Sequence, residues 1–242
     1  MQWVKTQMSK KPRILLKVSG EALMGKGNFG HENKIIDQIC EDIKEVYNLG
    51  YKICLVVGGG NICRGATLAE IGIERSAGDY MGMLATAINA IALQSKLESK
   101  GLVTRVSSAI PIVTIVEQYI RRKAIRHLEK GRILIFATGT GNPFFTTDTA
   151  AVLRAVEMNC SVILKGSQID GVYSDDPARD LSATKYQNLT YMEVINKNLS
   201  VMDTPAVALA RDNAIPIVVF NITKKGEFGR VLKKKGSFTT IN

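Results

Sequence analysis

Residues 52–67, KICLVVGGGNICRGAT, join an apolar run typical of a buried strand to three consecutive glycines and an arginine. Glycine loses more conformational entropy on folding than any other residue, so three in a row need a physical reason. One reason is a phosphate group that approaches backbone N–H groups where a Cβ atom would obstruct it. The other is a tight turn between a strand and a helix. The stretch alone leaves both interpretations open.

Two well-known phosphate-binding motifs do not fit this stretch. The pattern G-x-x-x-x-G-K-[ST], counted from Gly60, lacks its lysine because Ala66 stands in that position. The dinucleotide pattern G-x-G-x-x-G, counted from Gly58, is broken by Cys63. If a phosphate binds here, Arg64 supplies the positive charge, because a planar guanidinium group can hold two oxygens at once.

Apolar runs and helical patterns alternate on both sides of this stretch. The pattern predicts strands at residues 13–20, 51–60, 102–108, 132–142, 160–167 and, as the closing strand, 215–222. It predicts helices at residues 35–47, 80–99, 121–132 and 147–159 and near Met192 and Ala206, with a loop at 170–180. Such alternation indicates a mainly parallel central sheet flanked by helices on both faces, a three-layer α/β/α fold.

Four of the predicted strands end in small, polar or charged residues, in the segments 17–21, 58–65, 137–148 and 165–177. Ligands bind at the carboxyl ends of the strands in open parallel sheets, so we expect these segments to converge on one crevice. Together they supply Lys17, Lys165, an arginine, several acidic residues and many backbone N–H groups. Phosphoryl transfer depends on charge stabilisation and positioning, which this set of groups provides.

Each charged residue also has a purely structural interpretation. Lys17 interrupts an apolar strand, where an unpaired charge is costly, so we favour a function over a lysine that reaches solvent from an edge. Lys165 could cap its strand at the surface. Asp148 and Asp79 could be acidic residues favoured by a helix N-terminus. His127 lies in a basic helical run and is expected at the surface.

Composition limits the class of protein. The 242 residues are 45% hydrophobic, enough for one large domain or two joined lobes. No apolar run approaches the length of a membrane span or fits a signal peptide, which predicts a cytoplasmic protein without membrane association. Two histidines leave little material for a serine hydrolase or a His-based metal site. The four cysteines lack metal-ligand spacing and are expected to be reduced and mostly buried: Cys40, Cys54, Cys63 and Cys160.

The formal net charge of +10 indicates an anionic partner without identifying it. A nucleic-acid-binding protein is one alternative, but aromatic residues are only 6% of the chain and none interleave with the basic runs. We therefore interpret the basic runs as solvated surface.

The segments ILLKVSGEAL, VVGGGNICRGA, GDYMGMLAT, GTGNPFFTTDTAA and DGVYSDDP resemble the amino acid kinase family and, within it, the bacterial uridylate (UMP) kinases. The resemblance covers essentially the whole chain. It implies transfer of the γ-phosphoryl group of ATP to UMP, giving ADP and UDP, in pyrimidine nucleotide biosynthesis. A kinase of this fold acting on a small carboxylate or carbamate is the second alternative.

The resemblance also implies an organisation. It implies a single domain over residues 1–242, with a UMP lobe at about 1–160 and an ATP lobe at about 161–242. It implies Mg²⁺ carried with ATP and no metal ligands from the protein. A homohexamer is implied, with UTP as inhibitor and GTP as activator. The GTP-linked residues are Gly25, Lys26, Gly27, Asn28, Phe29 and Gly30.

The resemblance assigns roles to individual residues. The implied catalytic residues are Lys17, Asp148, Lys165 and Asp203. The implied ATP-binding residues are Lys17, Val18, Ser19, Gly20, Gly60, Arg64, Ser167, Tyr173 and Asp176. The implied UMP-binding residues are Gly59, Asp79, Thr140, Gly141, Asn142, Pro143, Phe144, Phe145, Thr146 and Thr147. The sequence departs from the family pattern at Cys63, Ser167 and Gln168, positions that bear on ATP affinity and regulation.

Overall fold

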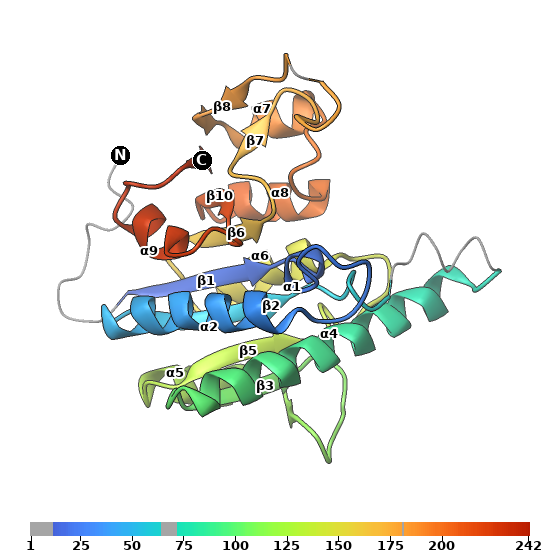
Figure 1. Ribbon diagram of the computed structural model, residues 1–242. Coiled ribbons are helices and arrows are strands. Elements are labelled where there is room, and N and C mark those ends of the chain that lie inside the picture. Colours follow the sequence, from blue (N-terminus) through green and yellow to red (C-terminus); the bar gives the residue numbers. More distant parts are fainter. Residues whose placement is uncertain (1–11, 64–71, 181) are drawn as a thin grey trace.

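The computed structural model describes residues 12–63, 72–180 and 182–242. In these residues one central sheet has the strand order β4-β3-β5-β2-β1-β6-β10-β11-β9 (Figure 1). Its strands are β1 (Arg13–Val18), β2 (Lys52–Val57), β3 (Thr104–Ser108), β4 (Glu117–Gln118), β5 (Ile133–Ala137), β6 (Ile163–Ser167), β9 (Asn188–Leu189), β10 (Ile217–Asn221) and β11 (Phe238–Ile241). A separate antiparallel pair consists of β7 (Val172–Tyr173) and β8 (Lys185–Tyr186).

The central sheet is mainly parallel. Every neighbouring pair from β4 to β10 is parallel, and the direction reverses between β10 and β11. Strand β1 lies in the middle, with β2 on one side and β6 on the other. The carboxyl ends of β5, β2, β1 and β6 therefore lie next to one another, as the sequence predicts for its four polar segments.

Helices cover both faces of the sheet. Side chains alternate along β1, so Leu16 faces one layer while Leu15 and Lys17 face the other. The first layer consists of α1 (Gly20–Leu23), α2 (Asn33–Asn48), α4 (Arg75–Ser99) and α9 (Glu227–Leu232). The second consists of α5 (Arg121–Glu129), α6 (Thr147–Glu157), α7 (Tyr191–Asn196) and α8 (Thr204–Asp212). The predicted three-layer α/β/α fold is confirmed.

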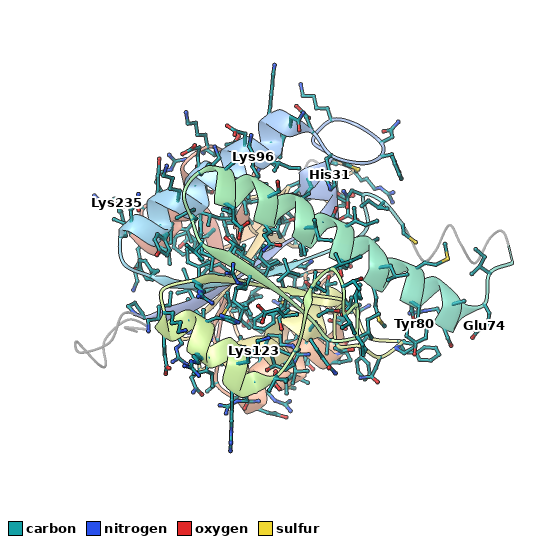
Figure 2. All side chains as sticks on the ribbon, turned by 90° about the horizontal axis from the view of Figure 1, so that it is seen from below. His31, Glu74, Tyr80, Lys96, Lys123 and Lys235 are labelled. Carbon is teal, nitrogen blue, oxygen red and sulfur yellow. The ribbon has the colours of Figure 1, made fainter. Side chains whose placement is uncertain are left out.

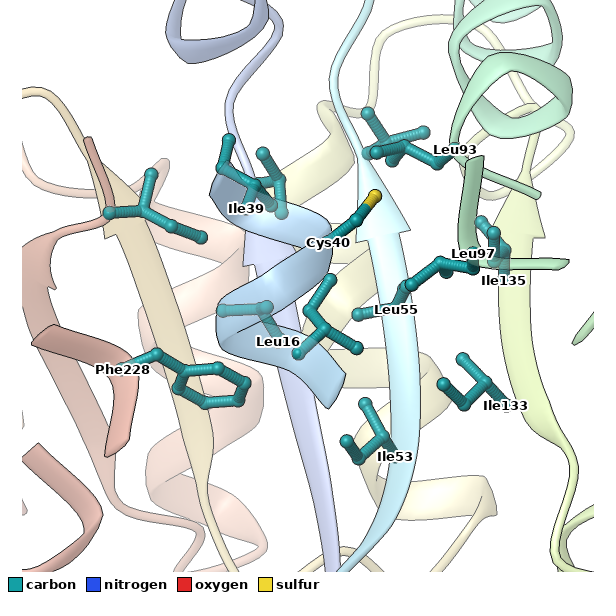
Figure 3. Close-up of a cluster of buried hydrophobic side chains, with 14 of the residues drawn as sticks. Leu16, Ile39, Cys40, Ile53, Leu55, Leu93, Leu97, Ile133, Ile135 and Phe228 are labelled. Atoms are coloured by element: carbon teal, nitrogen blue, oxygen red, sulfur yellow. The ribbon is translucent and has the colours of Figure 1, made fainter. Parts of the chain in front are cut away.

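The first layer packs through the apolar face of α2. Ile39 and Cys40 lie over Leu16 and Leu55 of the central strands, and Leu97 of α4 continues the same cluster (Figure 3). Both faces of each central strand are buried, which explains why these strands are almost uniformly apolar in sequence. Within the described ranges, none of the helices combines the length and apolarity needed to cross a membrane.

Two sequence predictions about the periphery are wrong. The strand at 215–222 does not close the fold, because α9 and β11 follow it. Both are short, and α9 begins after Gly226 without a side-chain cap, so neither has a strong sequence signal. His127 is buried, not at the surface. Its Nδ1 accepts a hydrogen bond from Arg132, so its Nε2–H donates to Glu117.

A buried carboxylate joins α2 to α9. Both oxygens of Asp42 accept hydrogen bonds from the backbone N–H of Gly226, at 2.9 and 3.0 Å. Burial raises the pKa of Asp42 from 3.8 to about 6, although the Gly226 hydrogen bond and the charge of Arg230 act in the opposite direction. The folded state therefore favours the protonated carboxyl more than the unfolded state does.

This shift predicts that Asp42 makes stability depend on pH. Its contribution is fully present below about pH 4 and is lost as the pH rises through about 6. We expect Asp42→Asn, which cannot ionise, to lose less stability than the wild-type chain between pH 5 and pH 8. Urea unfolding at both pH values measures the difference. Equal losses in the two proteins would contradict the assignment.

Candidate active site

Two lysines lie side by side at the carboxyl end of the central strands. Lys17 of β1 is paired in register with Lys165 of β6, so both side chains leave the same face of the sheet. Lys17 is only 6% exposed. Two ammonium groups held this close to each other and out of water require a negative charge between them.

Asp148 supplies that charge. It lies in the first turn of α6, whose N-cap residue Thr146 accepts a hydrogen bond from the Asp148 backbone N–H at 3.0 Å. The Asp148 carboxylate lies 2.8 Å from Lys17 Nζ through Oδ1 and 2.7 Å from Lys165 Nζ through Oδ2. We call these three residues the Lys-Asp-Lys cluster. Two positive charges and one negative charge leave the cluster with one net positive charge.

The pKa values follow from burial and from these contacts. Burial acts to raise the pKa of Asp148, but the charges of Lys17 and Lys165 outweigh it and lower the pKa to about 2. Burial lowers the pKa of Lys165, since the opposing effect of Asp148 is partly cancelled by the charge of Lys17. Asp148 is therefore fully ionised at neutral pH.

Asp203 completes the predicted catalytic set. It is the N-cap residue of α8, and its Oδ2 accepts a hydrogen bond from Thr149 Oγ1 at 2.6 Å. Its Oδ1 is buried and has no hydrogen-bond partner among the described residues. Its charge acts to raise the pKa of Lys165, as expected for a neighbouring carboxylate. The structure thus brings the four predicted catalytic residues together from β1, β6, α6 and α8.

Two of the three glycines after β2, Gly58 and Gly59, are explained by close packing of the chain on itself. None has a positive φ, so an unusual backbone conformation is not the reason. A Cβ atom on Gly58 would lie 2.8 Å from the backbone nitrogen of Gly20 at the start of α1. A Cβ atom on Gly59 would lie 2.8 Å from the carbonyl oxygen of Gly82 in α4. Both distances are too short for real Cβ contacts, so the turn needs glycine to lie against these two helices.

A cavity of about 540 Å³ opens beside this glycine turn. Its lining includes these predicted UMP-binding or ATP-binding residues: Gly59, Gly60, Asp79, Thr140, Phe145, Thr146 and Thr147. Gly141, Asn142, Pro143 and Phe144 belong to the same loop but do not line the cavity. Asp79 holds this loop, because its Oδ2 accepts a hydrogen bond from the Phe144 backbone N–H at 2.8 Å and both its oxygens accept from Arg75.

A second cavity of about 540 Å³ lies on the β6 side. The predicted residues Lys165, Ser167, Tyr173 and Asp176 line it. The Tyr173 hydroxyl donates a hydrogen bond to Asp170 at 2.7 Å. Of the Lys-Asp-Lys cluster, Lys165 lines this second cavity, and Asp148 directly follows Thr147, a lining residue of the first, in the chain.

Other predicted residues lie elsewhere. Val18, Ser19 and Gly20 form the junction between β1 and α1 and line neither cavity. Arg64 lies outside the described residues. The segment Gly25 to Gly30 lies between α1 and α2, where its Asn28 and Phe29 line a third cavity against α4.

Sequence reasoning missed two residues that hold the site from behind. Thr86 of α4 is buried, lines the first cavity and accepts a hydrogen bond from the Thr138 backbone N–H at 2.7 Å. Thr138 has φ 62°, an uncommon conformation for a β-branched residue, and it begins the loop that Asp79 holds. A polar residue on the buried face of a helix, as at Thr86, is a signal that the sequence offers.

Comparison with known proteins shows which family the chain belongs to. The family model described as "Amino acid kinase family" matches residues 12–221. The chain belongs to the amino acid kinase family. It is 58% identical over 229 residues to "Uridylate kinase" of Rickettsia prowazekii (strain Madrid E), with 95% of each chain covered. It is 56% identical over 230 residues to "Uridylate kinase" of Wolbachia sp. subsp. Brugia malayi (strain TRS), covering 95% of this chain and 93% of that one.

Solved structures show the same similarity. The crystal structure of UMP kinase from Bacillus anthracis has a TM-score of 0.91 at 40% identity and covers 96% of both chains. That of UMP kinase from Ureaplasma parvum has a TM-score of 0.91 at 37% identity, covering 96% of this chain and 99% of that one. The family predicted from the sequence motifs is therefore confirmed.

The buried cluster leads to a prediction about stability. Asp148→Asn leaves two buried ammonium groups without their carboxylate, which should cost about 3–5 kcal/mol of unfolding free energy. Asp37 is a matched control, because its carboxylate lies 2.8 Å from both Lys96 and Lys100 but is 45% exposed. Asp37→Asn should change stability little, since solvent screens exposed pairs. Urea unfolding of both variants at pH 7 tests this contrast, and similar losses would refute it.

Proposed function

We propose that this chain transfers the γ-phosphoryl group of ATP to UMP, giving ADP and UDP, as a step of pyrimidine nucleotide biosynthesis. The observation that carries the proposal is the buried Lys-Asp-Lys cluster at the carboxyl ends of β1 and β6, next to residues that line two cavities of about 540 Å³ each. The similar chains from Rickettsia prowazekii and Bacillus anthracis carry the names uridylate kinase and UMP kinase. The predicted activity agrees with both.

The cluster suits this chemistry. A transferring phosphoryl group spreads negative charge over its oxygens, and fixed positive charges in a dry site stabilise it. Lys17 and Lys165 would neutralise that charge, while Asp148 holds the two ammonium groups beside each other. Asp148, with a pKa of about 2, is too weak a base to accept a proton at neutral pH. No general base is needed, because the phosphate of UMP is already ionised at neutral pH and its oxygen can attack without losing a proton.

The two cavities support the predicted division into lobes. We assign the first cavity to UMP, and its described lining residues fall between positions 21 and 147 of the sequence. We assign the second cavity to ATP, and its described lining residues fall between positions 165 and 219. In this arrangement Gly59 approaches the UMP phosphate, Asp79 accepts hydrogen bonds from the ribose, and Gly60 and Arg64 hold the ATP phosphates.

Magnesium would arrive with ATP and keep most of its waters. Among the described residues no group of three or more His, Cys, Asp and Glu side chains is arranged to hold a metal ion. The buried Asp203 Oδ1, which lacks a hydrogen-bond partner there, fits a role as acceptor for a metal-bound water. The ion would add positive charge on the ATP phosphates.

The surface of α4 supports assembly into a homo-oligomer, as the family resemblance implies. Four apolar side chains at helical spacing, Met81, Leu84, Ile88 and Ile91, are between 36% and 51% exposed. We call this row the apolar stripe of α4. A stripe of this kind is typical of a surface that another protein covers. Hexamer formation, activation by GTP through residues 25–30, inhibition by UTP and a cytoplasmic location belong to the same proposal.

One assay discriminates this function from its rivals. ADP release is measured with ATP and, in turn, UMP, CMP, glutamate, aspartate and carbamate. We expect UMP to be the preferred acceptor. Release with a carboxylate or carbamate and indifference to UMP would indicate the second activity of the fold. Strong binding of DNA or RNA that weakens steeply with salt, together with no kinase activity, would favour a nucleic-acid-binding protein.

Substitutions at Lys17 and at Asp79 should change different kinetic parameters. We expect Lys17→Ala to lower kcat by about 10²–10³-fold, since its charge acts most strongly on the transition state. Asp79→Ala should chiefly raise the KM for UMP, because contacts to the ribose act equally in both states. Asp79→Asn keeps one oxygen for the Phe144 N–H and controls for loosening of the loop. A Lys17→Ala enzyme with normal kcat, or an Asp79→Ala enzyme with normal UMP KM, would reject these assignments.

The apolar stripe predicts the effect of a surface charge on assembly. Leu84→Glu places a carboxylate in the middle of the stripe and should shift the chain to smaller species in sedimentation velocity. Leu49→Glu is the control, because Leu49 is 51% exposed and lies at the end of α2, outside the stripe. Unchanged sedimentation of Leu84→Glu would show that assembly does not use α4.

A further inference from the structure

Two asparagines are paired behind the glycine turn. Asn61 is 1% exposed and Asn89, in the middle of α4, is fully buried. Asn89 Nδ2 donates to Asn61 Oδ1 at 2.7 Å, and Asn61 Nδ2 donates to Asn89 Oδ1 at 3.2 Å. Their amides therefore form a two-way hydrogen-bonded pair, which we call the amide pair.

The amide pair reaches two segments of backbone. Asn89 Nδ2 also donates to the carbonyl oxygen of Gly58 at 2.7 Å. Asn61 Nδ2 donates to the carbonyl oxygen of Gly30 at 2.8 Å, and the Gly30 N–H donates to the carbonyl oxygen of Asn61 at 2.8 Å. The pair thus joins α4, the glycine turn and the end of the segment between α1 and α2.

The direction of each hydrogen bond is fixed by its partners. The carbonyl oxygens of Gly58 and Gly30 can only accept, so the NH₂ groups of both asparagines must face them. Asn89 Oδ1 then accepts from His31 Nε2, which lies 2.6 Å away and beside α4 (Figure 2).

A buried amide pair of this kind contributes more to the geometry of the segments that it joins than to the stability of the fold. Burying two primary amides is costly unless their donors and acceptors are paired, and apolar side chains could fill the same space. The pair also lies next to the proposed site. Gly59 and Gly60 line the first cavity, and Thr86, which lines it too, precedes Asn89 by three residues on α4. Asn61 and Asn89 are not among the predicted site residues, but they hold the glycine turn, whose Gly59 and Gly60 are.

We propose that Asn61 and Asn89 are positioning residues for phosphoryl transfer, which fix the glycine turn at the distance from α4 that the reacting phosphates require. The proposal rests on the proposed function. A misplacement of about 1 Å in a site of this kind can cost about 10²-fold in rate. The amide pair acts through the turn and need not touch substrate.

Asn89→Ala tests the proposal, since alanine keeps the helix and removes the amide. We expect kcat for UMP phosphorylation to fall by about 10²-fold with a smaller change in the KM for UMP, because Asp79 and its loop are untouched although Gly59 is displaced. Hydrogen exchange of the nucleotide-free variant, followed by mass spectrometry, should be faster in peptides covering residues 56–63 and 25–31. Peptides from β6 and β10 should exchange as in the wild-type chain.

Two variants serve as controls. Thr104, in β3, lines neither cavity of the site, and its buried hydroxyl donates to the carbonyl oxygen of Leu102. Thr104→Val removes this hydroxyl and should lower stability without lowering kcat. His31→Ala removes the exposed end of the hydrogen-bonded chain and should leave kcat unchanged. If Asn89→Ala does not fold, Asn61→Ala carries the same expectation, because it removes the partner amide and leaves α4 intact.

Wild-type kcat and exchange in the asparagine variant would overturn the proposal. An equal fall in kcat for Thr104→Val at the same loss of stability would overturn it too, because the effect would then be general destabilisation. If the wild-type chain releases no ADP with UMP, the proposed function fails. The exchange measurement still decides in that case whether the amide pair holds the turn.

Discussion

The site depends on one carboxylate between two lysines. Lys17 and Lys165 are brought together by the parallel register of β1 and β6, and without Asp148 their repulsion would oppose the pairing of these strands at that point. Asp148 in turn requires α6 to begin at the carboxyl end of the sheet, where Thr146 caps the helix. The ion pairs that we propose for phosphate binding are therefore also needed for β1 and β6 to pair at the centre of the sheet.

Around this cluster, α4 orders the substrate side of the molecule. Asp79 accepts from the Phe144 N–H, Thr86 accepts from the Thr138 N–H, and Asn89 donates to the Gly58 carbonyl oxygen. The loop between β5 and α6 and the glycine turn are thereby attached to one helix. This attachment explains why the loop and the turn can be rich in glycine and polar residues while the crevice between them keeps its shape.

Much of the fold and part of the site could be predicted from the sequence. Apolar runs of strand length, helical periodicity and the polar endings of four strands indicated the sheet and the place of the crevice. The cost of burying Lys17 indicated that a partner exists. It did not identify Asp148, whose position equally fits an ordinary acidic residue at a helix start. Register, which places Lys165 beside Lys17, is a property of the assembled sheet and has no local signal. The same is true of Asn89, which looks like any other polar residue in a long helix until its partners are known.

The attachment of the β5–α6 loop and the glycine turn to α4 through three side chains has a mechanical consequence. If α4 moved as one body, a displacement along its axis would carry Asp79, Thr86 and Asn89 by the same amount. The opposite face of α4 carries the apolar stripe. A partner that bound to that stripe and displaced α4 would shift all three attachments together. The substrate crevice would then widen or narrow as a whole. The width of the crevice would therefore depend on the position of one helix, α4.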